Sequence, residues 1–174
     1  MGDTDGLAPR PAGLQDEVEV MSSMAAIQDF LAQKRIAVVG VSHNPKDFSR
    51  ALLRSMRQHG YDAVAVNPTL NAADGAPCYA RLAEVAPPVD GVLLMTSPAI
   101  TDQVVQECAR LHIPRVWMFR AGGKGAVSPQ AVEFCEEHGI AVVAGECPYM
   151  FLSGENWFHR LHGFIKKISG AYPS

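Results

Sequence analysis

Residues 36–68 have the pattern of one complete strand, loop, helix and strand, and this unit constrains the fold more than any other part of the chain. Residues 36–39 are apolar and mostly β-branched, and Gly40 ends this run. A polar loop and a helix follow, and a second apolar run ends at Asn67-Pro68. In such a unit the loop after the first strand leads into a helix N-terminus, whose free N–H groups and dipole attract anions. The sequence therefore predicts an α/β fold that binds a phosphorylated ligand.

The glycine pattern of this loop differs from the pattern of NAD-binding sites. In G-x-G-x-x-G, the three glycines make the tight turn, admit the pyrophosphate and allow the helix to pack on the strand. Gly40 holds the first position, but Ser42 and Pro45 hold the other two. NAD sites also place a carboxylate after the second strand to bind the ribose, and Asn67-Pro68 stand there instead. The expected ligand is thus phosphorylated but is not bound as NAD is.

Several further motifs follow this unit in a specific order. The motifs are V-G-V-S-H-N-P (39–45), Ser49, G-Y (60–61), V-N-P (66–68), P-C-Y and L-A-E-V (77–85), V-D-G-V (89–92), V-W-M (116–118) and C-P (147–148). Their order resembles that of the small stand-alone CoA-binding proteins, which are related to the CoA-binding domain of the succinyl-CoA synthetase alpha subunit. The resemblance covers roughly residues 24–150. It implies a Rossmann-like domain with coenzyme A or an acyl-CoA as its ligand.

The resemblance also implies which residues contact the ligand. The first loop would line the diphosphate, the adenosine or its phosphate would enter beside Asn67-Pro68, and residues after later strands would border the pocket at the carboxyl edge of the sheet. The candidates are Gly40, Val41, Ser42, His43, Asn44, Pro45, Lys46, Ser49, Asn67, Pro68, Thr96, Ser97, Pro98, Met118, Phe119, Arg120 and Ala121. For the polar loop residues the alternative is that they only cap a helix. For Lys46 and Arg50 the alternative to a phosphate partner is a solvated surface charge.

The remaining elements are predicted from apolar runs and helix caps. Ser22 or Ser23 would cap a first helix, and Ser97-Pro98 and Ser128-Pro129 would each open another. The pattern also predicts a loop at 69–76, a very short edge strand at 77–79, a helix at 80–85, and strands at 91–95, 116–119 and 140–144. Apolar runs without alternation are typical of a parallel sheet covered on both faces. We expect an α/β, Rossmann-like doubly wound parallel sheet with strand order 3-2-1-4-5-6.

Composition bounds the domain organisation and the partners. A chain of 174 residues that is 48% hydrophobic is large enough for one buried core and small for two. We expect a mobile tail at 1–20, a CoA-binding domain at 21–152, and a C-terminal helix at 153–174 that packs on the domain or on a partner. The net charge of −3 argues against nucleic acid or membrane as the main partner. A homodimer or a protein partner stays open.

Four cysteines are too widely spaced for a C-x-x-C metal or redox pair. The N-terminus has no apolar leader and no stretch approaches ~18 apolar residues, so we expect a reduced, cytoplasmic protein. Cys78, Cys108 and Cys135 are expected to be buried and inert. Cys147 follows the last strand, and it is either buried as well or within reach of a CoA sulfur.

No catalytic constellation stands out in the sequence. It contains neither G-x-S-x-G nor H-E-x-x-H, and His159 and His162 lack neighbouring ligand residues, so we expect no metal site. The glycine-rich residues 120–125 lack the spacing of an NTP-binding loop and are expected to form a rim of the pocket. The alternatives to simple CoA binding are an NAD(P)-linked oxidoreductase domain completed by a partner, and a regulatory module that senses acyl-CoA.

Overall fold

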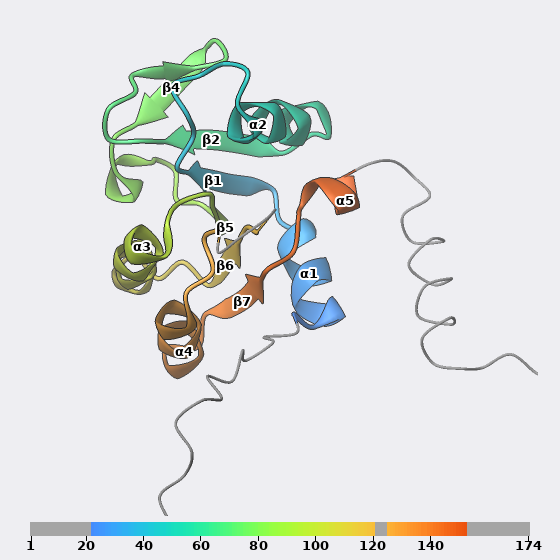
Figure 1. The fold of residues 1–174 in the computed structure, drawn as a ribbon, viewed down its shortest axis with the longest axis vertical. Helices are drawn as coiled ribbons and strands as arrows, with labels where there is room; N and C mark the ends of the chain where they lie inside the picture. Colours follow the sequence, from blue (N-terminus) through green and yellow to red (C-terminus); the bar gives the residue numbers. More distant parts are fainter. Residues whose placement is uncertain (1–21, 121–124, 153–174) are drawn as a thin grey trace, which may run out of the picture.

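The computed structural model describes residues 22–120 and 125–152, and Figure 1 shows their arrangement. In this part of the chain one sheet holds seven strands in the order β3-β4-β2-β1-β5-β6-β7. The strands are β1 (Arg35–Val39), β2 (Asp62–Val66), β3 (Ala72–Ala73), β4 (Ala76–Tyr79), β5 (Gly91–Leu94), β6 (Arg115–Met118) and β7 (Ala141–Ala144). The helices are α1 (Met24–Leu31), α2 (Phe48–Gln58), the short 3₁₀ helix η1 (Leu82–Glu84), α3 (Pro98–Arg110), α4 (Pro129–Glu137) and α5 (Tyr149–Leu152).

The predicted fold class is confirmed, and the strand order differs from the prediction at one edge. Strands β4, β2, β1, β5, β6 and β7 pair in parallel and correspond to the expected order 3-2-1-4-5-6. Beyond β4 the structure adds β3, which is antiparallel to it. Residues 69–76 are therefore not simply a loop, because Asp74 and Gly75 both have positive φ and form a tight hairpin turn. The short strand predicted at 77–79 is consequently not the edge.

The helix predicted at 80–85 is also shorter than expected. Only Leu82–Glu84 is helical, with 3₁₀ geometry, and both flanking residues are extended. Pro87 and Pro88 follow closely and oppose a longer helix, since a residue before proline is driven out of the α region. In contrast, α3 and α4 begin at the prolines that the sequence indicated, and Ser23 is the N-cap of α1.

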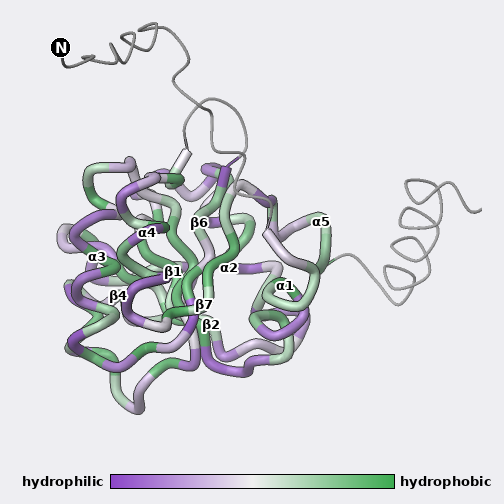
Figure 2. Tube along the Cα trace, turned by 90° about the horizontal axis from the view of Figure 1, so that it is seen from below, coloured by the Kyte–Doolittle hydropathy of each residue, from purple (hydrophilic) through white to green (hydrophobic). Residues whose placement is uncertain are grey.

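Helices cover the sheet on both faces, as a doubly wound fold requires (Figure 1). Ala37 and Val39 of β1 belong to a core shared with α3 and α4, while Ile36 and Val38 belong to a core shared with α1 and α2. Alternate residues of one buried strand therefore serve opposite layers. In Figure 2 the strands carry the hydrophobic colour between helices whose outer sides are largely hydrophilic.

Several predictions concern residues outside the described part of the chain. They are the mobile tail at 1–20, the C-terminal helix at 153–174 with His159 and His162, and the candidate contact Ala121. Within the described residues, no helix has the length and apolar character needed to cross a membrane. The same residues contain no group of three or more His, Cys, Asp or Glu arranged to hold a metal ion.

Candidate functional site

A cleft of about 370 Å³ opens at the carboxyl ends of β1, β5 and β6. β1 and β5 are neighbours, and the chain winds outward from them in opposite directions, to β2 on one side and to β6 on the other. In open α/β sheets this reversal leaves a crevice in which ligands bind. The lining residues are Gly40, Ser42, Asp47, Phe48, Ser49, Met95, Thr96, Phe119, Gly125 and Ala126.

The cleft brings together some of the residues that the sequence singled out. The candidates that line it are Gly40, Ser42, Ser49, Thr96 and Phe119. The other described candidates lie around it. Val41 and Met118 are fully buried, Asn67 and Ser97 follow β2 and β5, and Pro98 begins α3. The exposed candidates are His43, Asn44, Pro45, Lys46, Pro68 and Arg120. Sequence reasoning missed four lining residues, namely Asp47, Phe48, Met95 and Ala126, whereas Gly125 belongs to the segment that was expected to form a rim of the pocket. Asp47 precedes a helix and is a preferred N-cap residue type, which is a signal that could have found it.

Gly40 allows the loop after β1 to approach β5 closely. Its φ is +91°, a conformation that L side chains rarely adopt. A Cβ at this position would lie only 2.6 Å from the carbonyl oxygen of Met95. Glycine is thus required here by backbone conformation and by space, which agrees with its role as first glycine of the motif.

Side chains within the β1–α2 loop accept hydrogen bonds from the loop's own amides. The amide of Ser42 donates to Ser49 Oγ at 2.9 Å, and Asn44 N donates to Ser42 Oγ at 3.1 Å. Asp47 Oδ1 accepts from the amide of Ser49 at 2.8 Å and from its hydroxyl at 2.5 Å. Ser42, Asn44 and Ser49 therefore stabilise the turn and the helix start, while Ser42 and Ser49 also face the cleft.

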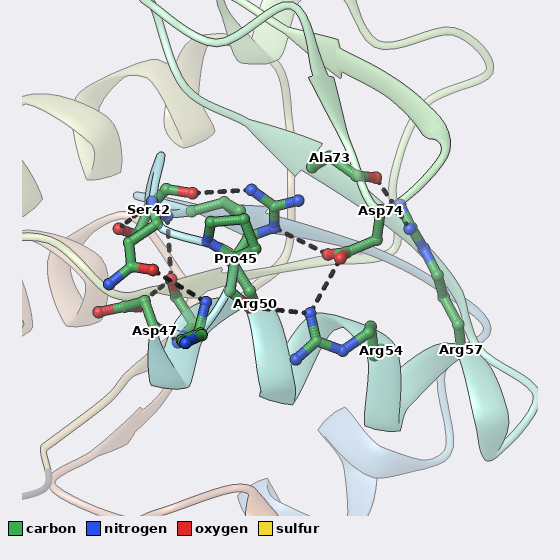
Figure 3. A network of polar contacts seen from close by, with 12 residues as sticks. Ser42, Pro45, Asp47, Arg50, Arg54, Arg57, Ala73 and Asp74 are labelled. Carbon is green, nitrogen blue, oxygen red and sulfur yellow. Dashed lines mark hydrogen bonds and ion pairs between the residues drawn. The ribbon is translucent and has the colours of Figure 1, made fainter.

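Two arginines of α2 hold the same loop from its other side (Figure 3). Arg50 Nη1 donates to the carbonyl of Ser42 at 3.1 Å, and Arg54 Nη1 donates to the carbonyl of Pro45 at 3.2 Å. Asp74 binds both guanidinium groups, Arg50 Nε at 2.8 Å and Arg54 Nη1 at 2.9 Å. We call Arg50, Arg54 and Asp74 the arginine brace. It fixes the carbonyls of the two residues that replace glycines in the motif.

The arginine brace overturns the interpretation of Arg50. Its side chain is 8% exposed and that of Asp74 is 15% exposed, so Arg50 is not a solvated surface charge, and its Nε and Nη1 are bonded within the protein. The hydrogen bond from Arg50 is the main reason that the pKa of Asp74 lies below its usual value. The same bond raises the pKa of Arg50. Lys46, by contrast, is exposed on the loop.

Asn67 connects the end of β2 to the same loop. Its Nδ2 donates to the carbonyl of Val41 at 2.8 Å, and its Oδ1 accepts from the amide of Thr69 at 2.8 Å. His43 Nε2 lies 2.8 Å from the hydroxyl of Thr69. The asparagine that replaces the carboxylate of NAD sites therefore supports the loop through a donor that an aspartate lacks.

The four cysteines are free thiols and differ in burial. Cys108 and Cys135 are buried as predicted, and desolvation raises the pKa of Cys108 strongly and that of Cys135 to about 12. Cys78 is only half-buried, and its pKa is raised chiefly by desolvation. Cys147 is half-buried beside the core that contains α1 and α2.

A mostly parallel sheet covered by helices on both faces, with a crevice at its switch point bordered by a one-glycine loop and the start of α2, defines a Rossmann-like domain. The family model described as a CoA binding domain matches residues 34–153, which is more than half of the chain. The chain belongs to this family, as the order of its motifs indicated.

Relatives include both small proteins and parts of larger enzymes. An uncharacterized protein of Bacillus subtilis strain 168, YneT, is 31% identical over 72% of this chain and 90% of its own length. The ADP-forming acetate–CoA ligase I of Archaeoglobus fulgidus is 25% identical over 66% of this chain, which corresponds to 18% of that enzyme. A solved structure of a hypothetical protein from Pyrococcus horikoshii OT3 superposes with a TM-score of 0.65 and 26% identity, covering 84% of this chain and 93% of that one.

Proposed function

We propose that this protein binds coenzyme A or an acyl-CoA in the cleft at the carboxyl ends of β1, β5 and β6. The observation that carries the proposal is the β1–α2 loop, which borders a cleft at the switch point and whose single motif glycine lies against β5. The family and its relation to an ADP-forming acetate–CoA ligase support coenzyme A as the ligand. The proposed role is binding alone, with no chemical step assigned to the chain.

The order of the strands supports a particular placement of the ligand. The loops after β2, β1, β5 and β6 lie side by side at one edge, so an extended ligand can run across them in that order. We place the adenosine beside Asn67-Pro68 and the diphosphate along residues 40–46 and Ser49, with the pantetheine passing residues 96–98 and 118–121. Val41 and Met118 are fully buried, which argues against direct contacts from these two candidates.

Thermal unfolding of the full chain with different ligands tests the proposed binding. A ligand at ~100 times its Kd stabilises the native state by about 2.7 kcal/mol, which raises the Tm of a domain of this size by roughly 5 to 10 °C. We expect this shift with CoA and little shift with NAD or NADP. A larger shift with NAD or NADP would instead support the oxidoreductase alternative, and no shift with any of them would contradict nucleotide binding.

The cellular setting belongs to the same proposal. Free thiols at all four cysteines are typical of a reducing compartment, which supports a cytoplasmic location. A homodimer or another protein partner is an expectation that size-exclusion chromatography with light scattering would test.

A further inference from the structure

Three aromatic rings from distant parts of the chain meet beside the cleft. Phe48 is the first residue of α2, Phe119 directly follows β6, and Tyr149 is the first residue of α5. The rings of Phe48 and Phe119 are stacked, with centroids 5.2 Å apart, and the Tyr149 ring lies 6.1 Å from Phe48. We call these three residues the aromatic wall. It exists because α5 packs beside α2 (Figure 1).

The aromatic wall leaves apolar surface in contact with solvent. Phe48 is 40% exposed and Tyr149 is 47% exposed, while Phe119 is buried beneath them. Phe48 and Phe119 line the cleft together with Met95 and Ala126, so the exposed ring surface continues into it. Exposed apolar surface that is continuous with a cleft is a feature of ligand-binding sites.

The position of the wall along the sheet indicates which part of the ligand it meets. β2, where the adenosine is placed, and β6, where Phe119 stands, are separated by β1 and β5. A ligand that begins beside β2 and crosses the diphosphate loop passes Phe48, next to Ser49, and reaches the Phe119 side of the wall with its opposite end. In an acyl-CoA the end opposite the adenosine is the thioester with its acyl group.

The chemistry of the cleft selects among acyl groups. Among the described residues that line it, Asp47 is the charged one, and it is an anion. A carboxylate-bearing acyl group would lose hydration against the rings, and none of the described lining residues is a cation that would compensate for this loss. A neutral acyl chain gains from the transfer of its methylenes out of water, by about fourfold in affinity for each one buried.

We propose that the aromatic wall is a subsite for a neutral, apolar acyl group, so that the protein discriminates in favour of such acyl-CoAs over free CoA. This inference rests on the proposed binding of CoA in the same cleft. Phe48 and Tyr149 are its specificity-determining residues, because their rings are exposed beside the cleft, while Phe119 is buried and stacks on Phe48.

The experiment is isothermal titration of the full chain with CoA, hexanoyl-CoA and succinyl-CoA. With two or three methylenes buried, hexanoyl-CoA is expected to bind at least about tenfold more tightly than CoA. Succinyl-CoA is expected to bind no more tightly than CoA. Tyr149→Ala, outside the lining of the cleft, is expected to remove most of the hexanoyl preference while the affinity for CoA itself stays within about twofold. Phe48→Ala, at a residue that lines the cleft, is expected to weaken hexanoyl-CoA binding more than CoA binding.

Leu111→Ala is the matched control, because Leu111 is a similarly exposed apolar residue at the far end of α3, and it should change neither affinity. Melting curves verify that each variant is folded. If Phe48→Ala does not fold, Tyr149→Ala, a change at the surface, still tests the subsite. Equal affinities of the unchanged protein for CoA and hexanoyl-CoA would overturn the subsite and leave CoA binding intact. Loss of CoA affinity in both variants would also overturn it, and binding of none of the three ligands would overturn the subsite and the proposed function together.

Discussion

The β1–α2 loop and the β5–α3 loop open onto the same cleft but are held in different ways. The first spans residues 40–47 and is fixed by its own side chains and by the arginine brace. The second spans only residues 95–97 before Pro98 begins α3, and its side-chain contact is the 2.9 Å hydrogen bond between Thr96 and Thr101. A long loop without the usual glycines needs side-chain bonds to keep one shape, whereas a short loop is fixed by the strand and the helix that it joins.

The two helix N-termini differ as well. Asp47 caps α2 and places a carboxylate where an anion would gain from the helix dipole. Ser97, at the N-cap of α3, makes no side-chain cap hydrogen bond. The proposed binding mode implies a division of roles, in which the first loop lines the diphosphate and the N-terminus of α3 borders the neutral pantetheine. Pro98 has no N–H, and Ile100 and Thr101 donate their amides to Ser97 O.

The largest expected effect is at Gly40, where the two loops touch. Gly40→Ala should lower the free energy of unfolding by about 3 to 5 kcal/mol, since the positive φ and the approach to Met95 O both oppose a Cβ. Gly60→Ala is the matched control, because Gly60 has φ +86° but no atom within 4 Å of the point where a Cβ would stand, so that only about 1 to 2 kcal/mol should be lost. Urea unfolding measures both, and equal losses would show that the loops can separate freely.

The next effect concerns the arginine brace. Asp74→Ala should lower the free energy of unfolding by about 3 kcal/mol, because it leaves the guanidinium of Arg50 buried without its carboxylate. Arg54→Ala should cost less, about 1 kcal/mol, since Arg54 is 40% exposed. It should also weaken CoA binding if the brace keeps the loop in its binding shape. A loss from Arg54→Ala as large as the loss from Asp74→Ala would contradict this account.

The arginine brace also predicts an acid dependence. The pKa of Asp74 is lower in the folded protein, chiefly through its hydrogen bond with Arg50, so the unfolded chain binds more protons just below the usual carboxyl value of 3.8. The stabilisation by Asp74 is therefore complete above this value and is lost as the pH falls through the lowered pKa. Asp74→Asn removes this titration, so the difference in unfolding free energy between the two proteins should shrink below about pH 4. A constant difference down to about pH 2 would contradict it.

The difference between elements that depend on local sequence signals and elements that do not explains how far the sequence predicted the fold. The six parallel strands and the starts of α3 and α4 depend on apolar runs and on Ser-Pro caps, which are local signals. β3 was missed because its two alanines have low β-propensity, although Asp74-Gly75 is a hairpin signal. The bounds of β5, β6 and β7 differ by one residue from the apolar runs, because buried residues such as Phe119 and Ile140 lie just outside the strands.

The site was predicted where it depends on strand ends and was missed where it depends on tertiary contacts. Gly40, Thr96 and Phe119 line the cleft because each follows a central strand. The arginine brace joins Arg50 to Asp74, which is 24 residues away in the turn between β3 and β4. No local sequence pattern indicates that pairing. The aromatic wall likewise depends on how α5 packs beside α2.

The charge at the two helix N-termini tests the division of roles directly. Ser97→Asp places a carboxylate at the N-terminus of α3, beside the neutral pantetheine, and should change the affinity for CoA by less than about twofold. Asp47→Asn keeps a capping oxygen and removes a charge from the cleft, so it should strengthen binding by about two- to fivefold. Titrations at low and high salt should show the effect of Asp47→Asn shrinking with ionic strength. A five- to tenfold loss of affinity in Ser97→Asp, about the effect of one like charge beside a phosphate, would place a phosphate at α3 and contradict the proposed binding mode.

The smallest expected effect is a partial chemical modification at the other end of the ligand. Cys147 follows β7, two residues before Tyr149 of the aromatic wall, whereas the other half-buried cysteine, Cys78, lies in β4 beyond the adenosine side. With oxidised CoA, attack by the Cys147 thiolate on the disulfide should form a protein–CoA mixed disulfide and release one CoA thiolate. Cys108 and Cys135 should react least, because burial raises their pKa. Peptide mapping before and after a thiol reductant measures the site and its reversal. Modification spread evenly over the cysteines, or confined to Cys78, would mean that the sulfur end of the ligand does not lie beyond β6. That result would also contradict the acyl subsite at the aromatic wall.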